Sequence, residues 1–214
     1  MKRLVSILAF TLLPLGYAVG GSFAHSHRAW TDLLRQHVVL IDGGSGSQVR
    51  YAELKNKRTE LKAYLDTLSS ATLTEFERWS KAQQLAFLLN AYNAFTVELI
   101  LTRYPHLASI RDFGRFIDNP WKKRFFKILG QEQNLDGIEH GTIRAPGVYD
   151  EPRIHMAVNC ASIGCPMLRE EAYVADRLAV QLEEQVVRFL SDRSRNRYDV
   201  TTRTLEVSEI FDWY

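Results

Sequence analysis

The segment His155–Leu168, HMAVNCASIGCPML, contains both cysteines of the chain, Cys160 and Cys165. A cysteine nucleophile needs a lowered thiol pKa and a base within hydrogen-bonding distance, held in place by a third polar group. His155 stands five residues before Cys160, and His140 comes from a separate segment. The residue types therefore predict a catalytic cysteine–histidine site with either histidine as the base.

Amide and charged side chains near these residues could orient the base or bind a substrate. The candidates are, for orienting the histidine, Asn159 and Asn93 and, for binding the substrate, Arg144, Glu139 and Asn90. Arg144 follows His140 by four residues, so both would lie on one face of a short helix. Its guanidinium suits a carboxylate, although an ion pair with an acidic neighbour such as Glu139 is the commoner role. Buried asparagines likewise more often bind neighbouring loops.

The two cysteines also allow three other interpretations. A disulfide forms across this spacing if the loop folds back until the two Cα atoms are within about 7 Å, and Ile163-Gly164 would ease that bend. A bridge that cycles would make a thiol–disulfide oxidoreductase, and a permanent bridge would shape a binding loop. A zinc set of both cysteines with His140 and His155 matches no common ligand spacing, so we predict no metal and no cofactor.

The N-terminus has the pattern of a secretory signal peptide. Two basic residues precede an apolar run, Leu4–Val19, and small residues two positions apart end at Ala24. We expect residues 1–24 to be removed and residues 25–214 to form one exported domain, periplasmic or secreted. No stable membrane anchor would remain after this cleavage.

The charge pattern bears on the partner. Without residues 1–24 the chain has 25 basic and 25 acidic residues, since two basic residues leave with the signal peptide. The signs alternate along the chain, which does not fit a nucleic-acid-binding protein, and the substrate stays unknown. His25 and His27 would lie at a disordered start of the exported domain.

Hydrophobic periodicity predicts a mostly helical α+β domain. Arg28–Leu40 has helical spacing and is followed by a flexible glycine-rich loop, Asp42–Ser47. Further helices are predicted for Glu53–Leu68, Asp136–Arg144 and Asp176–Asp192, and β-hairpins for Arg124–Leu135 and Tyr198–Val207. Leu85–Tyr104 is apolar nearly all round and should be the buried central helix, with a capping box at Ser80–Gln83.

One central strand, Arg153–Asn159, is predicted to lead into the Cys160–Cys165 loop. Side chains alternate along a strand, so an unbroken strand would point His155 and Cys160 to opposite faces. If instead the chain turns at Cys160, this constraint disappears. His140 could be the base for Cys160 with or without such a turn, because it comes from another segment.

Several segments together resemble the family named domain of unknown function 547. They are LAFLLNAYNAFTVELIL, SIRD, NPW, LDGIEHGTIR, EPRIHMAVNCASIGCPMLREEAY and LEVSEIFDWY, which span roughly Leu85–Tyr214. The resemblance implies an exported bacterial member, short at its C-terminus relative to the family. It implies no established reaction, although some animal relatives join the domain to a glutaredoxin-like one.

The residue types favour a cysteine-dependent hydrolase or acyl-transfer enzyme. The likeness to papain-like and transglutaminase-like enzymes is an analogy of residue types alone. The alternatives are a non-enzymatic envelope binding module with a Cys160–Cys165 disulfide, and a thiol–disulfide oxidoreductase.

Overall fold

The computed structural model describes residues 22–107, 109–114, 119–162 and 164–213. The signal peptide expected for residues 1–24 lies outside these ranges except for its last three residues. All statements below refer to the described residues.

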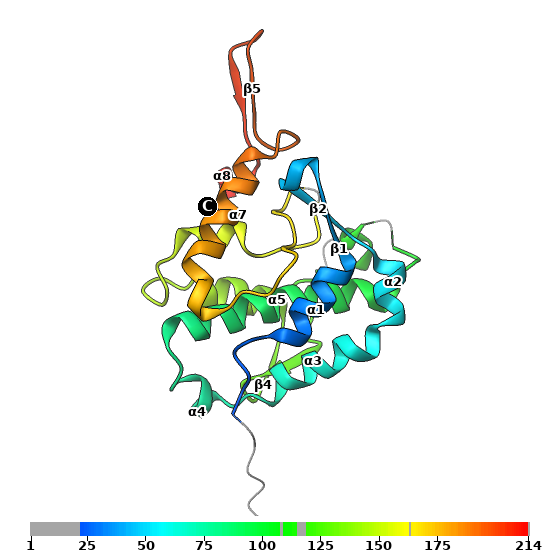
Figure 1. Cartoon of the computed structure of the whole chain (residues 1–214), viewed down its shortest axis with the longest axis vertical. Coiled ribbons are helices and arrows are strands. Elements are labelled where there is room, and N and C mark those ends of the chain that lie inside the picture. The colour runs from blue at the N-terminus through cyan, green and yellow to red at the C-terminus, as the bar shows by residue number, and fades with distance from the viewer. Residues whose placement is uncertain (1–21, 108, 115–118, 163, 214) are drawn as a thin grey trace, which may run out of the picture.

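Helices make up most of the domain, and short strands accompany them (Figure 1). The α-helices are α1 (Arg28–His37), α2 (Tyr51–Asn56), α3 (Arg58–Ser70), α4 (Leu73–Phe76), α5 (Lys81–Arg103), α6 (Leu135–Ile138), α7 (Leu178–Ser191) and α8 (Ile210–Trp213). The antiparallel hairpins pair β1 (Val38–Ile41) with β2 (Gly46–Val49), β3 (Phe126–Ile128) with β4 (Gln131–Gln133), and β5 (Arg197–Asp199) with β6 (Thr204–Glu206). Short 3₁₀ helices are η1 (Asp42–Gly44), η2 (Ile110–Phe113), η4 (Pro152–Met156) and η5 (Ala175–Arg177). The predicted α+β class is confirmed.

Helix α5 is the core of the domain and crosses its centre in Figure 1. It begins at the predicted capping box, in which the Ser80 hydroxyl accepts from the Gln83 N–H and the Gln83 side chain accepts from the Ser80 N–H. Because it is apolar nearly all round, it is covered on all sides, with α3 among the helices packed against it. By length and composition α5 is the one helix among the described residues that could cross a membrane, and 94% of that apolar window is buried inside the protein.

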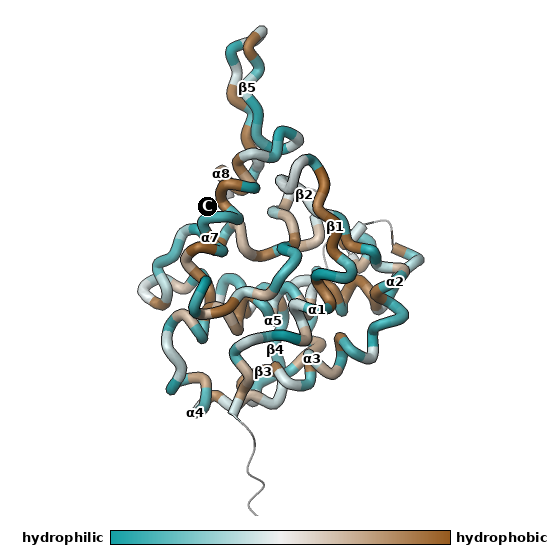
Figure 2. The backbone as a smooth tube through the Cα atoms, in the orientation of Figure 1, coloured by the Kyte–Doolittle hydropathy of each residue, from teal (hydrophilic) through white to brown (hydrophobic). Residues whose placement is uncertain are grey.

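The β5–β6 hairpin projects from the body of the domain (Figure 1). Figure 2 shows apolar stretches along it. Tyr198 pairs with Leu205 across the strands, and both side chains are exposed. This hairpin was predicted from its alternating pattern.

The β1–β2 hairpin corrects the first helix prediction. Helix α1 ends at His37, and the next residues pair with Gly46–Val49 as a strand. The sequence VVLI is rich in β-branched side chains, which favour strands over helices. Gly43 and Gly44, with φ of 68° and 95°, turn the chain between the strands where we had expected only a flexible loop.

The predicted central strand Arg153–Asn159 is wrong. Most of this segment is the 3₁₀ helix η4, with Pro152 in its first turn and the Glu151 carboxylate accepting from the Arg153 N–H as a cap. A proline followed by a capped turn favours helical φ and satisfies the first free N–H groups. The apolar pattern thus reports burial of this segment, not a strand.

The expectation of a disordered start at His25 and His27 is also wrong. His27 is 3% exposed, and its Nδ1 lies 2.8 Å from the Tyr64 hydroxyl. The Phe23 ring contacts both histidines and the Phe87 ring. The backbone N–H of Phe23 donates to Glu75 Oε1 at 2.8 Å. The segment before α1 is therefore part of the folded domain.

Candidate cysteine–histidine site

Two asparagine side chains hold the segment around Cys160. Asn93, on buried helix α5, donates from Nδ2 to the Ala157 carbonyl at 3.0 Å and accepts from the Asn159 N–H at 2.8 Å. Asn159 in turn donates to the Pro166 carbonyl at 2.7 Å and accepts from the Ala161 N–H at 3.2 Å. Both amides are thus bonded to backbone groups, the commoner role considered for buried asparagines, and these bonds replace those that a strand would have made.

The chain turns immediately after Asn159. Ala161 has a φ of 56°, in the left-handed region that costs an alanine energy and persists only where the surroundings impose it. The Asn159 side chain imposes it by accepting the N–H two residues on, as in an Asx turn. Cys160 therefore lies in a turn, and the alternation argument against His155 as its base no longer applies.

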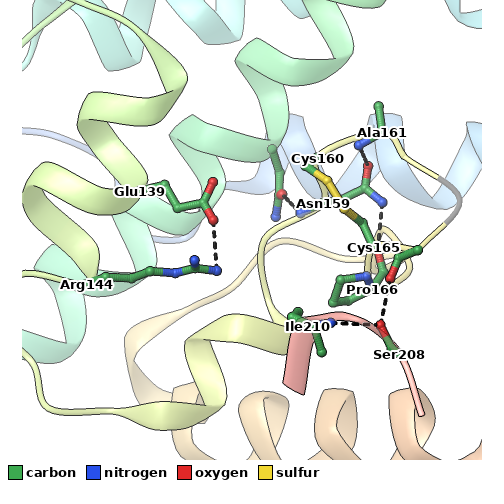
Figure 3. Close-up of a disulfide and its surroundings, with 11 residues drawn as sticks. Glu139, Arg144, Asn159, Cys160, Ala161, Cys165, Pro166, Ser208 and Ile210 are labelled. Carbon is green, nitrogen blue, oxygen red and sulfur yellow. Dashed lines mark hydrogen bonds and ion pairs between the residues drawn. A yellow bond between two sulfur atoms is a disulfide. The ribbon is translucent and has the colours of Figure 1, made fainter. Parts of the chain in front are cut away.

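Cys160 and Cys165 form a disulfide with their Cα atoms 6.0 Å apart (Figure 3). Cys165 is 5% exposed, whereas Cys160 is only partly buried. The loop is closed a second time by the bond from Asn159 to Pro166, and the Ser208 hydroxyl donates to the Gly164 carbonyl at 3.2 Å. Hydrogen bonds thus hold the loop independently of the covalent bond.

A cavity of about 300 Å³ has the disulfide in its wall. His140 and His155 line the same cavity, so the structure brings both candidate bases to the cavity that Cys160 lines. Arg144 and Glu139 face the bridge from the opposite side (Figure 3). A second, more open hollow of about 610 Å³ adjoins it, because His140, Arg144 and His155 line both.

A π-helical turn positions the charged side of the cavity. The predicted helix Asp136–Arg144 consists of α6 followed by the π-turn η3 (Glu139–Ile143), after which the Arg144 N–H donates to the Glu139 carbonyl. π-turns are rare and occur frequently at functional sites. Arg144 Nη2 lies 2.8 Å from Glu139 Oε1, with both side chains about nine-tenths buried. The ion pair considered from the sequence is therefore formed.

His155 is the candidate base whose charge state the surroundings determine. Burial lowers its pKa to about 4, and the positive charge of Arg144 and the neighbouring His140 add to that shift. The imidazole is therefore neutral near pH 7 and has a lone pair that can accept a proton. His140 lies on the π-turn and is exposed.

Asn90 lies away from this cavity. Its side chain accepts from the Tyr173 N–H at 2.9 Å and donates to the Tyr173 carbonyl at 2.8 Å, which ties the segment before α7 to the core helix. Its predicted place in substrate binding has no support from its position. No group of three or more His, Cys, Asp or Glu side chains within the described ranges is arranged to hold a metal ion.

Several residues that line the cavity were not assigned to the site from the sequence. Arg111, Trp121 and Asp136 are among them. Each lies in a segment that carries the family resemblance, SIRD, NPW or LDGIEHGTIR. The family resemblance of these three segments, which lie outside the cysteine motif, was the signal in the sequence that could have identified these residues.

Fold and cavity together define a mostly helical α+β domain with a disulfide and two histidines on one cavity. The family model described as Protein of unknown function, DUF547, matches residues 76–190, more than half of the chain. The chain belongs to this family. Comparisons with curated proteins and with solved structures found no match.

Proposed function

We propose that this protein is a cysteine-dependent hydrolase or acyl-transfer enzyme that acts when the Cys160–Cys165 bridge is reduced. The observation that carries the proposal is that Cys160, His155 and His140 line one cavity while hydrogen bonds hold the Cys160 loop in place. Preorganisation of the nucleophile beside a base is what thiol catalysis requires. The geometry would survive reduction because it does not depend on the bridge alone.

The nucleophile is generated by reduction with a dithiol. Two thiols of the reductant become a disulfide, and the bridge takes up two electrons and two protons to give Cys160 and Cys165 as thiols. The low pKa of His155 belongs to the bridged state. After reduction His155 takes the Cys160 proton, because the thiolate that remains is a negative charge that favours the protonated imidazole. The positive charge of Arg144 on the same cavity favours the thiolate.

The acyl step follows from this pair. The Cys160 sulfur attacks an amide or ester carbonyl, a C–S bond forms, and the C–N or C–O bond breaks as His155 returns the proton to the leaving group. Water or a second nucleophile then cleaves the thioester and regenerates the thiol. His140, on the exposed side of the cavity, is the alternative proton acceptor.

The proposal is tested by the alkylation of reduced protein with iodoacetamide between pH 5 and 9, with each cysteine followed by mass spectrometry. We expect Cys160 to react with a thiol pKa below the ordinary ~8.5. His155→Gln should raise that pKa, whereas His106→Gln, which changes an exposed histidine outside the cavity, should leave it unchanged. A Cys160 thiol with an ordinary pKa in all three proteins would sink the proposal.

A thiol–disulfide oxidoreductase is the second candidate, because both cysteines of the bridge line the cavity and Cys160 is the more exposed of the two residues. An incoming thiolate would attack Cys160 and release Cys165. Cys165→Ser separates the two functions. It abolishes oxidoreductase turnover in an insulin-reduction assay, but it leaves an acyl-transfer nucleophile in place.

Export is part of the proposal. The N-terminal pattern of basic and apolar residues supports a signal peptide, and a disulfide is compatible with an oxidising compartment. Fractionation of the producing cells should recover the protein outside the cytoplasm. Recovery only in the cytoplasm would contradict it.

A further inference from the structure

The cavity carries one basic and one acidic side chain that are not used in an ion pair among the described residues. Arg111 lies on η2 and is exposed, and Asp136 lies on α6 and is partly buried. In ranges 22–107, 109–114, 119–162 and 164–213 neither side chain makes a hydrogen bond or salt bridge. Arg144 and Glu139, on the same cavity, form an ion pair with each other. The cavity therefore presents two opposite charges to an incoming ligand.

A third polar group that lines this cavity also lacks a partner within the described part of the chain. The indole nitrogen of Trp121 is buried and donates to no acceptor within the described part of the chain. The Asp136 N–H donates to the Trp121 carbonyl at 2.9 Å, which fixes the two residues side by side. Buried donors without an acceptor are uncommon in folded proteins, and a bound ligand oxygen is one way in which they are satisfied.

These three groups have complementary roles toward one chemical class. An arginine binds a carboxylate, an aspartate binds an ammonium group, and an indole N–H donates to a carbonyl oxygen. We propose that the cavity binds the zwitterionic end groups of a short peptide or aminoacyl amide, with Arg111 at the carboxylate, Asp136 at the ammonium group and Trp121 at the acyl oxygen. The identity of the substrate rests on the proposed function, but the binding does not require the thiol.

The size of the cavity agrees with this class. About 300 Å³ is at the lower end of the volumes of small-molecule sites, and a dipeptide is a ligand of that scale. One positive and one negative recognition group match a ligand with no net charge. A ligand with a carboxylate but no ammonium group would have no group for Asp136 to bind, and its negative charge would be repelled by that of Asp136.

The test uses the oxidised full-length protein, because its bridged cysteines cannot turn a substrate over. The probes are alanylalanine, its N-acetyl derivative and its C-terminal amide, measured by titration calorimetry. Blocking either end should weaken binding roughly fivefold, the size expected for one partly exposed charge pair. Equal binding of all three probes, or no binding of alanylalanine, overturns the proposal.

Variants assign each end of the ligand to one residue. In Arg111→Gln the C-terminal amide should bind as well as the free dipeptide, whereas the penalty for N-acetylation stays. In Asp136→Asn the N-acetyl derivative should bind as well as the free dipeptide, whereas the penalty for C-terminal amidation stays. Arg78→Gln and Asp66→Asn, which change exposed charges outside the cavity, should keep both penalties. A variant that loses both penalties together would refute the assignment.

Trp121→Phe keeps an aromatic ring and removes only the N–H donor. It should weaken all three probes by the same factor, since every probe retains the acyl oxygen. Unchanged affinity would refute the role of Trp121. The alkylation experiment fails or succeeds separately, because it reports on the Cys160 thiol and involves no ligand.

Discussion

Reduction of the Cys160–Cys165 bridge should lower the free energy of unfolding by about 2 kcal/mol and leave the protein folded. The bridge closes a loop with a sequence separation of 5. In the chain-entropy model such a short loop restricts the unfolded chain by about 7 cal/mol/K, or about 2 kcal/mol at 25 °C. The Asn159 bonds to Ala161 and Pro166 still shape the loop after reduction. Because native domains are stable by about 5–15 kcal/mol, most of that stability is retained.

Urea and thermal denaturation with and without a dithiol measure this loss. For a domain of this size the melting temperature should fall by about 4–8 °C. The double variant Cys160→Ser/Cys165→Ser should show the lower stability from the start and no response to the dithiol. Asn159→Ala should cost more in the reduced protein than in the oxidised one, since the amide is then the remaining closure. Complete unfolding on reduction would refute the reasoning, because the bridge would then be an essential structural staple.

Three further outcomes follow from the packing. Asn90→Ala leaves the buried N–H and carbonyl of Tyr173 without partners and should lower the free energy of unfolding by roughly 2–6 kcal/mol in urea denaturation. A loss under 1 kcal/mol would contradict the role of these two hydrogen bonds. Burial, aided by the neighbouring His25, lowers the pKa of His27 to about 3. The contribution of the neutral ring to the free energy of unfolding is therefore complete above pH 6.5 and is lost as the pH falls toward 3. Proton NMR should show a neutral His27 ring at pH 5, and His27→Gln should flatten this part of the plot of stability against pH. A chain that begins at His25 loses Phe23 and should melt about 4–8 °C below one that begins at Ser22, a loss of roughly 2 kcal/mol of ring burial; equal melting temperatures would show that the ring contributes nothing.

Local signals in the sequence were sufficient for much of the fold. Helix α5 follows from a segment that is apolar nearly all round after a capping box, and both are properties of neighbouring residues. The β3–β4 and β5–β6 hairpins follow from short alternating segments around a turn. The strand VVLI after α1 carried a recognisable β-branched signal that helical spacing obscured.

The site was predictable in residue type but not in arrangement. Cys160, His140 and His155 were identified from chemistry and spacing, and all three line one cavity. Arg111 and Asp136 were missed because an isolated arginine or aspartate looks like a solvated surface charge until the fold gives it a cavity to face.

The sequence by itself determined the core helix, most of the helices and hairpins, the family and the cysteine pair with its candidate bases, because each depends on residues close together in the chain. Only the tertiary structure decided how the segment before Cys160 folds. There the side chain of Asn93, more than sixty residues away, takes the backbone bonds that a strand would have used. Such a bond forms only after α5 is packed, so no local pattern reports it. The turn that it supports brings Cys160 to the cavity that His155 also lines.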